Sequence, residues 1–326
     1  MLKKNVPYTE NSQAKYRVLI DIEPAVKDLI LRHESKRNLW YSSDFLPANQ
    51  GTFNEKFLSD LRKRADGIPD SVRIAVSLNV LTEEGLPHFH RIIADNLGQC
   101  GEWGKWNGIW TAEEDRHGNI LRDYIRDSRL LNFSVLESLQ FDYIRTGFHP
   151  VWNGDPYKIF VYTSLQEKAT HISHLNTGKA VVEQEPLLWE IAQNIAQDES
   201  RHYAFYMNVF KEIIARDPNA ALECAAEIMP GIDMPGISMA NFNEFADIVR
   251  RSGIYTLRDY EKIVEQLIVS WGIASLTGLN NVGKKAQEKI MLLPSRLKKV
   301  ADFIDSHVDS KSFKFDLIFG RIIEML

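Results

Sequence analysis

The sequence predicts an all-α fold, and three observations support this prediction. Turn and helix-stop signals such as Asn153-Gly-Asp-Pro156, Glu185-Pro186 and Asp217-Pro218 separate long stretches of the chain. No clear alternating pattern of a strand is present. Apolar residues instead recur at helical spacing over residues 72–97, 103–125, 135–147, 157–182, 187–216, 240–251, 257–273 and 284–305.

We expect residues 1–326 to form one helical domain, because no low-complexity linker divides the chain. Its core would be a bundle over about residues 70–216, with peripheral helices on both sides. Residues 230–238, rich in Pro, Gly and Met, are expected to form a loop. A chain with 44% hydrophobic and 25% charged residues is ordinary for a globular protein, and at this length it buries a large core without disulfides.

Composition and charge narrow the class of protein. Cys100 and Cys224 lack the spacing of a zinc site, so we expect unreactive thiols in a reducing cytosol. A net charge of −5 argues against a surface built throughout for nucleic acid. No stretch approaches the roughly 20 apolar residues that span a bilayer, and residues 1–16 lack the apolar segment of a secretory signal. We therefore expect a cytoplasmic protein without a membrane span.

A short motif occurs twice. Residues 113–117 are Glu-Glu-Asp-Arg-His and residues 198–202 are Asp-Glu-Ser-Arg-His. Residues three apart share one face of a helix, so Glu114 with His117, and Glu199 with His202, each offer an oxygen and a nitrogen to one point. A single Glu-x-x-His is usually a surface pair, but two copies with matching flanks indicate a shared metal site.

Two further glutamates are expected on the helices that precede the motifs. Glu167 lies among apolar and small residues, where a buried carboxylate needs a compensating partner. Before the first motif the candidates are Glu83 and Glu84, and spacing alone does not separate them. Pro87 lacks the amide that would bond to the carbonyl of Glu83, so we expect a distorted helix there.

Two Glu-x-x-His helices plus one glutamate from each of two others is the ligand pattern of ferritin-like di-iron bundles. Such a carboxylate-rich set suits iron or manganese better than zinc. The predicted fold is therefore an all-α, ferritin-like four-helix di-iron bundle core with additional peripheral helices.

The sequence around these residues resembles the soluble acyl-acyl-carrier-protein desaturases, a plant stearoyl-type family with bacterial members. The resemblance extends from about Trp40 to the C-terminus and includes both motifs. It also includes the blocks Leu81–Pro87, Tyr162–Thr170, Leu276–Leu279 and Leu293–Arg296. It implies Glu83 as the first ligand. The implied metal ligands are Glu83, Glu114, His117, Glu167, Glu199 and His202.

The same resemblance implies two iron ions in an oxo-bridged pair. It implies O₂-dependent desaturation of a saturated fatty acyl chain carried on acyl carrier protein, which introduces a cis double bond with electrons from ferredoxin. It also implies a homodimer. Two alternatives remain: another di-iron oxidation, such as hydroxylation or N-oxygenation, and a non-catalytic metal- or carrier-binding relative.

The resemblance also assigns roles around the metal ligands. Asp198 would hydrogen-bond His117, and Trp40 would complete an electron path through that pair, whereas simple core packing is the competing interpretation for Trp40. Thr170 would support the activated oxygen species, and a bond from its hydroxyl to its own helix is the alternative. Arg116 and Arg201 are expected to form salt bridges between helices.

By the same resemblance the substrate channel is lined by Ile92, Asp95, Asn96, Pro150 and Ile159. Ile159 stands where plant members usually carry a glycine, and Asp95 and Asn96 stand where they carry less polar residues. A buried Asp95 would need a partner. These departures leave the length of the acyl chain and the position of the double bond open.

Two basic clusters are expected to dock the acidic carrier, although charge runs are more often just solvated faces. They are Arg32, Lys36 and Arg37 before Trp40, and Arg296, Lys298 and Lys299 near the C-terminus.

Overall fold

A computed structural model describes residues 10–46, 54–307 and 309–325. Residues 1–9, which belong to the segment 1–16 that was expected to lack a secretory signal, lie outside the described residues. The helices up to the second motif are α1 (Glu10–Lys36), α2 (Ser42–Phe45), α3 (Glu55–Asp66), α4 (Asp70–Glu83), α5 (Leu86–Leu97), α6 (Gly101–Ser128), α7 (Phe133–Thr146), α8 (Lys158–Lys179) and α9 (Pro186–Arg216). The later elements are α10 (Pro218–Ile228), α11 (Phe242–Arg251), α12 (Leu257–Ser270), η2 (Ile273–Ser275), α13 (Asn281–Met291), α14 (Leu293–Ser306), β1 (Lys311–Phe315), η3 (Asp316–Ile318) and β2 (Arg321–Met325).

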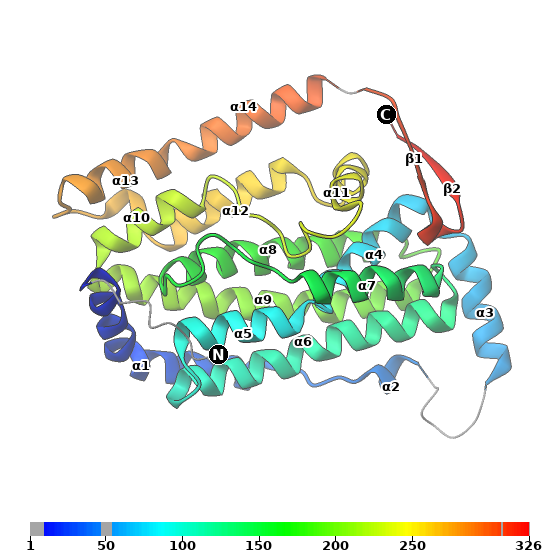
Figure 1. Cartoon of the computed structure of the whole chain (residues 1–326), viewed down its shortest axis with the longest axis horizontal. Helices are drawn as coiled ribbons and strands as arrows, with labels where there is room; N and C mark the ends of the chain where they lie inside the picture. Colours follow the sequence, from blue (N-terminus) through cyan, green and yellow to red (C-terminus); the bar gives the residue numbers. More distant parts are fainter. Residues whose placement is uncertain (1–9, 47–53, 308, 326) are drawn as a thin grey trace.

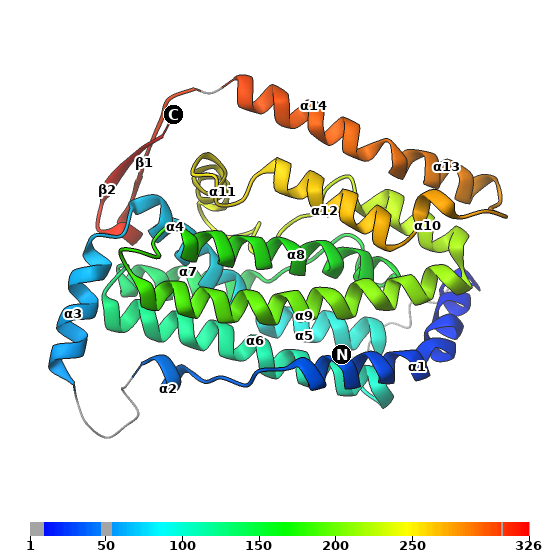
Figure 2. The same cartoon turned by 180° about the vertical axis from the view of Figure 1, so that it is seen from behind.

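Four helices form the central bundle. α8 packs on α9, α9 on α6, α6 on α4 and α4 on α8, so the contacts close into a ring. The long helices α6, α8 and α9 run side by side along the molecule in Figures 1 and 2. α1 covers α6 and α9, while α12 and α10 cover α8. This arrangement confirms the predicted all-α class with a four-helix core.

The stretch predicted as one helix over residues 72–97 is two helices. α4 ends at Glu83, and α5 begins at Leu86 with Pro87 in its first turn. Proline fits there because the backbone N–H groups of the first turn have no acceptor within the helix. Gly85 lies in the break, and a Cβ there would be 2.6 Å from the Tyr143 hydroxyl oxygen. The expected distortion at Pro87 is therefore a complete break, and Glu83 is the last residue of α4.

The apolar core has two parts. One is built around Trp106, Phe160 and Phe210, and the other around Val80, Leu121 and other residues of α4, α6 and α9. Along α6 and α9, the Glu-x-x-His motifs lie between the residues of the first part and those of the second. The bundle thus holds the charged residues of the two motifs between the two parts of the apolar core.

Several peripheral elements differ from the sequence prediction. Residues 284–305 form two helices that break at Leu292, just before Pro294, because a proline fits the start of a helix and not its interior. β1 and β2 form an antiparallel hairpin that the sequence analysis missed. Its apolar side, including Phe315 and Ile323, joins the core part around α4, but strands of five residues give little alternation to detect.

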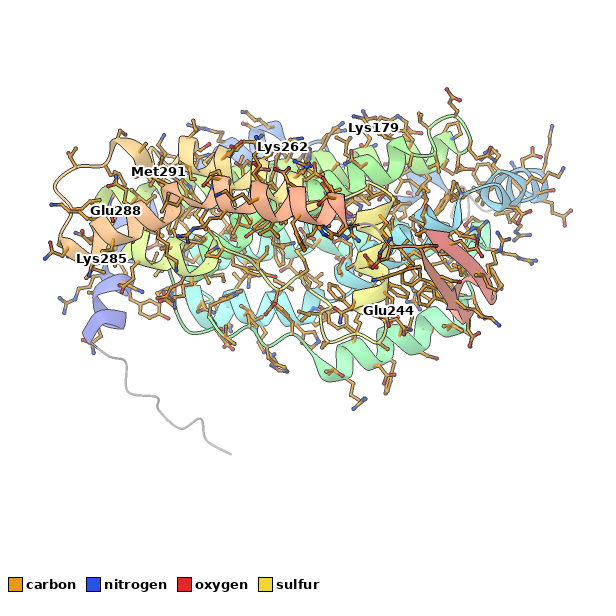
Figure 3. All side chains as sticks on the ribbon, turned by 90° about the horizontal axis from the view of Figure 1, so that it is seen from above. Lys179, Glu244, Lys262, Lys285, Glu288 and Met291 are labelled. Carbon is orange, nitrogen blue, oxygen red and sulfur yellow. The ribbon has the colours of Figure 1, made fainter. Side chains whose placement is uncertain are left out.

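Figure 3 shows α13 and α14 along one face, with Lys285, Glu288 and Met291 projecting from α13. These side chains are exposed, whereas Ala286 and Ile290 on the inner side are buried. Such a one-sided distribution is typical of a helix that packs on the outside of a domain. No helix in the described ranges carries an apolar stretch that could cross a bilayer.

Candidate metal centre

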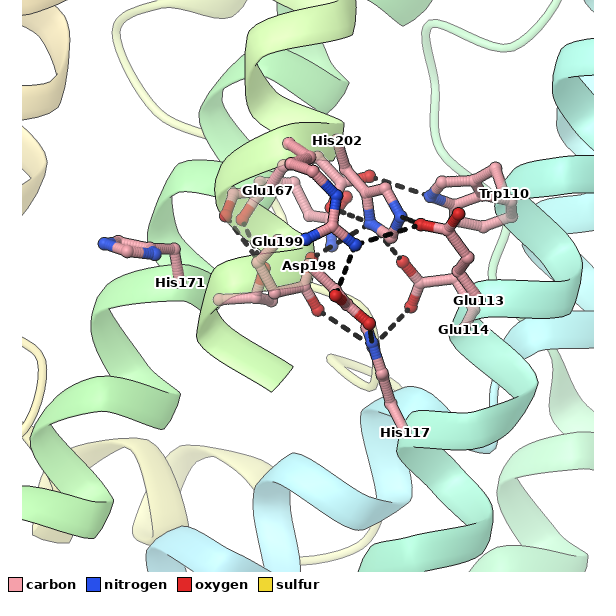
Figure 4. Close-up of polar contacts among 12 residues, drawn as sticks. Trp110, Glu113, Glu114, His117, Glu167, His171, Asp198, Glu199 and His202 are labelled. Carbon is pink, nitrogen blue, oxygen red and sulfur yellow. Dashed lines mark hydrogen bonds and ion pairs between the residues drawn. The ribbon is translucent and has the colours of Figure 1, made fainter. Parts of the chain in front are cut away.

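The structure brings six side chains from four helices to one place in the bundle. Figure 4 labels those from α6, α8 and α9. Each is at least nine-tenths buried, and they come from the end of α4 and from the middle of α6, α8 and α9. They are the six residues that the sequence analysis proposed: Glu83, Glu114, His117, Glu167, Glu199 and His202.

One half of the cluster surrounds His117. Its Nδ1 lies 3.7 Å from a Glu83 oxygen, 3.5 Å from a Glu114 oxygen and 3.3 Å from a Glu199 oxygen. The ligand atoms of these four residues lie within 4.8 Å of one another. One ion could therefore contact all four.

The other half surrounds His202. Its Nδ1 lies 2.8 Å from a Glu114 oxygen, 3.5 Å from a Glu199 oxygen and 3.7 Å from a Glu167 oxygen. These four ligand atoms also lie within 4.8 Å of one another. Glu114 and Glu199 belong to both halves, so they are placed to bridge two ions, while Glu83 and Glu167 each belong to one.

Unpaired polar atoms test whether the site fits metal ions. Among the described residues, one oxygen of Glu114, Glu167 and Glu199, and Nδ1 of both His117 and His202, are buried and form no hydrogen bond. Even the 2.8 Å contact between His202 Nδ1 and Glu114 lacks hydrogen-bonding geometry. An unsatisfied buried carboxylate or imidazole costs free energy, so such groups are rare unless something binds them. All five atoms face the centre of the cluster, and oxygen with imidazole nitrogen is a donor set that iron accepts.

Two of the carboxylates, Glu114 and Glu167, are also short of compensating positive charge. Burial, reinforced by the negative charges of Glu199 and Glu83, raises the pKa of Glu114 to about 7. Burial and the charge of Glu199 raise the pKa of Glu167 well above its usual range. Two cations would neutralise this buried charge.

The structure separates Glu83 from Glu84. Glu84 turns to Arg122, with an oxygen 2.9 Å from the guanidinium, and takes no part in the cluster. Glu83 is held by His174, whose Nε2 lies 2.8 Å from its Oε1. Burial acts to raise the pKa of Glu83, but the neighbouring imidazoles of His117 and His174 outweigh it and bring the pKa to about 2.

Asp198 occupies the place behind His117. Its Oδ2 lies 3.2 Å from His117 Nε2 and accepts a hydrogen bond of 3.1 Å from the indole of Trp40. The Trp40 ring also stacks on the His117 ring, with centroids 5.9 Å apart and planes 7° apart. Trp40 thus makes specific contacts with this pair in addition to packing in the core.

Both arginines of the motifs form ion pairs on the outer side of the cluster, as expected. Arg116 of α6 pairs with Asp198 of α9 at 3.0 Å. Arg201 pairs with Asp198 within α9 and lies 3.6 Å from Glu113 of α6. The pair of Arg116 with Asp198 and the contact of Arg201 with Glu113 connect the two motif helices.

Sequence reasoning missed three residues that support the cluster. Glu113 lies 3.0 Å from His202 Nε2, and it could have been found because it precedes Glu114 as Asp198 precedes Glu199. His174 is seven residues after Glu167 and so lies on the same face of α8. His33 contacts Glu113 from α1, and nothing in its local sequence indicates this contact. Figure 4 shows another α8 histidine, His171, turned away from the cluster, where it bonds the Ala196 carbonyl.

A small cleft adjoins the cluster on the side of α5 and the loop after α10. Thr170, Phe89 and Pro235 line it, together with Glu83 and Glu114. The Thr170 hydroxyl donates to the carbonyls of Gln166 and Glu167 of its own helix. The Thr170 hydroxyl therefore bonds to the backbone of its own helix, which was the alternative to a role at the oxygen site. The residue also lines the cleft beside the cluster.

The proposed channel residues do not all point inward. Ile92, Pro150 and Ile159 are buried, and Asn96 is buried with its amide bonded to Asn153. Asp95 is exposed, which differs from the expectation that it lines a channel. The reason is helical geometry, since each residue turns about 100° and the buried face of α5 passes through Asn96.

The two basic clusters lie far apart. Arg32 and Lys36 are exposed and Arg37 is half-buried at the end of α1, whereas the second cluster is exposed on α14. Figures 1 and 2 show α1 and α14 along opposite edges of the molecule. The two clusters therefore form two separate candidate surfaces for docking the acidic carrier.

The fold and the cluster together define a class of protein. It is a helical bundle in which two glutamates shared by both halves, two glutamates that belong to one half each and two histidines face one another in the interior. This is the arrangement of the di-iron carboxylate bundles.

Comparisons with known proteins specify the family. A family model described as fatty acid desaturase matches residues 14–319. The chain is 32% identical to the chloroplastic stearoyl-[acyl-carrier-protein] 9-desaturase of Olea europaea, over 99% of this chain and 90% of that protein. It is 33% identical to the acyl-[acyl-carrier-protein] 6-desaturase of Thunbergia alata, over 86% of this chain and 77% of that protein. The chain therefore belongs to the fatty acid desaturase family, whose curated relatives are oxidoreductases, and the predicted resemblance is confirmed.

A solved structure agrees on the fold. DesA2 of Mycobacterium tuberculosis H37Rv superposes with a TM-score of 0.58 and 22% sequence identity, over 83% of this chain and 99% of that one. At this identity the likeness supports the all-α bundle alone.

Proposed function

We propose that this protein desaturates a saturated fatty acyl chain carried on acyl carrier protein, using O₂ and electrons from ferredoxin to introduce a cis double bond. The observation that carries the proposal is the buried six-residue cluster in a chain of the fatty acid desaturase family. The names of the two plant relatives supply the substrate class.

Glu83, Glu114, His117 and Glu199 would hold one iron ion, and His202 and Glu167 would complete a second site with the two shared glutamates. When bound, an iron pair supplies the activation of O₂ that attack on an unactivated methylene requires. The protein's own contribution is to place the ligands, exclude water and position the chain.

The residues around the ligands have separate tasks. Asp198 accepts a hydrogen bond from Nε2–H of His117, which would leave Nδ1 free to face a metal ion. The Trp110 indole donates to a Glu167 oxygen at 3.1 Å and fixes that carboxylate. Trp40, stacked on His117, would carry electrons toward the centre.

The acyl chain would lie along the aromatic wall beside the cleft. Phe89 stacks on Phe148 with centroids 5.2 Å apart, and Tyr162 packs on Trp152 at 4.6 Å. Such a wall is apolar and excludes water from the reacting methylenes. Ile159 belongs to the same core part and would limit how far the chain extends.

The remaining parts of the proposal concern partners. We propose a cytoplasmic homodimer that recognises the acidic carrier through one of the two basic clusters, since they lie on opposite edges. Charge reversal in Lys298→Glu with Lys299→Glu, compared with Arg32→Glu with Lys36→Glu, identifies the docking edge by its effect on KM. Light scattering of the purified protein tests the dimer.

The test is mass spectrometry of acyl chains after reaction of the iron-loaded protein with acyl-carrier substrate, ferredoxin, reductant and O₂. The expected product is the acyl chain with two hydrogens removed. Glu83→Gln should abolish the product because it removes a ligand, and Glu84→Gln is the matched control because its carboxylate faces Arg122.

Each other outcome identifies an alternative. A product with one added oxygen atom would show hydroxylation, and iron oxidation with an unchanged chain would show a metal-storing protein. Equal loss of product in the Glu83 and Glu84 variants would contradict the assigned ligand set.

A further inference from the structure

The environment of the two ligand histidines is nearly symmetric. His117 of α6 contacts Asp198 of α9 through Nε2 at 3.2 Å, and His202 of α9 contacts Glu113 of α6 through Nε2 at 3.0 Å. Each acid thus precedes the ligand glutamate of its own motif and crosses to the histidine of the other. Both acids are buried, with exposed fractions of 1% and 2%.

The residue that supports each acid from behind differs between the two histidines. Behind Asp198 stands Trp40, which donates its indole N–H to the carboxylate and stacks on His117. Behind Glu113, the corresponding place is taken by a histidine, His33 of α1.

His33 makes the same two kinds of contact as Trp40. Its Nε2 lies 3.0 and 3.1 Å from the two oxygens of Glu113. Its ring stacks on the His202 ring, with centroids 5.8 Å apart and planes 15° apart. Trp106 meets the edge of His33 at 5.0 Å, so the ring is held in place from another direction.

The hydrogen-bond donors to Glu113 can be assigned to the imidazole rings of His33 and His202. A carboxylate only accepts hydrogen bonds, so Nε2 of both His33 and His202 must carry hydrogen. His33 Nδ1 has no hydrogen-bond partner in the described part of the chain. Arg37 and Arg201 are 3.6 Å from Glu113, so His33 and His202 provide the short contacts to this carboxylate.

We propose that His33 is a positioning residue for the His202 half of the metal centre. It fixes the Glu113 carboxylate, which in turn holds the His202 ring and keeps its proton on Nε2, with Nδ1 facing Glu114, Glu167 and Glu199. This inference rests on the proposed metal centre. It assigns each half of that centre its own outer support, Trp40 for one and His33 for the other.

The test is a titration of the metal-free protein with Co²⁺, followed by visible absorption and by the shifted ring-proton signals of the two ligand histidines. His33→Phe keeps a stacked ring but removes the hydrogen bond. Loss of such an outer partner typically weakens metal binding by about 10–100-fold, and we expect this loss only in the half that contains His202. His33→Gln retains an N–H donor and should recover most of the affinity.

Trp40→Phe is the mirror control, and it should weaken the half that contains His117 instead. If His33→Phe does not fold, Glu113→Gln carries the same test, because it weakens the acceptor between His33 and His202. Thermal unfolding of the metal-free variants separates a general loss of stability from a site-selective loss of binding.

Three results would overturn the inference: both Co²⁺ ions bind His33→Phe as tightly as the wild type, both halves weaken equally, or His33→Gln behaves as His33→Phe does. A wild-type protein that fails to take up a pair of Co²⁺ ions would instead refute the proposed metal centre itself.

Discussion

Glu114→Gln should change the stability of the metal-free protein and of the metal-loaded protein in opposite directions. Glu114 is a buried candidate ligand that belongs to both halves of the cluster and lies near the negative charges of Glu199 and Glu83. Without metal, the substitution removes a buried charge that is costly to hold. With metal, it removes a ligand from both halves of the centre.

The magnitude follows from the pKa of about 7, compared with an ordinary value of 4.5 for glutamic acid. At about 1.4 kcal/mol per pH unit, ionised Glu114 costs the folded state about 3 kcal/mol. The folded protein binds the proton more tightly than the unfolded chain, so stability falls as pH rises from 4.5 to about 7. The full cost is present above that range.

The assay is chemical and thermal unfolding of chelator-treated protein, at about pH 8 and about pH 5. Glu114→Gln should raise the free energy of unfolding by about 3 kcal/mol at the higher pH, or Tm by about 4–5 °C, and by clearly less at the lower pH. Glu190→Gln is the control, because Glu190 is exposed on α9 and its change should stay within about 0.5 kcal/mol. A metal-free Glu114→Gln that is less stable than the wild type at the higher pH, or equally stabilised at both, would refute the reasoning.

Three further predictions concern the site and its supports. Trp40→Phe should slow reduction of the loaded enzyme by ferredoxin in stopped-flow absorption by more than it slows reduction by a small chemical reductant, and equal slowing would contradict an electron path through the indole. Ile159→Gly should shift the preferred substrate toward longer acyl chains in competition assays, because it opens space in the apolar core, whereas an unchanged preference would place the channel elsewhere. Gly85→Ala should destabilise the protein by about 1–3 kcal/mol in denaturant unfolding, since its Cβ would lie 2.6 Å from the Tyr143 hydroxyl, and a neutral result would mean that this contact relaxes freely.

Local rules were sufficient for the main helices and for the ligand candidates. The predicted ranges 135–147 and 187–216 correspond to α7 and α9 within two residues at each end, because long periodic stretches and Pro or Gly signals act within one turn of helix. The repeat at residues 113–117 and 198–202 was informative because residues three apart share a helix face regardless of the rest of the fold. The hairpin of β1 and β2 was missed, since its stability comes from packing on α4 and not from its own sequence pattern.

The contacts that support the cluster depended on packing between distant segments. His33 reaches Glu113 across 80 residues of chain, and His174 reaches Glu83 across 91. Asp95 and Asn96 are neighbours in sequence, yet the packing of α5 buries one and exposes the other.

The sequence by itself therefore determined the helical class, the two motifs and the set of carboxylates and imidazoles, because these depend on the regular geometry of single helices. Only the tertiary structure decided that Glu84 faces Arg122 while Glu83 faces the cluster, that His33 and Trp40 support opposite halves, and that the basic clusters lie on opposite edges. These relations depend on how separate helices pack, and helix packing is fixed by contacts between residues that local periodicity does not connect.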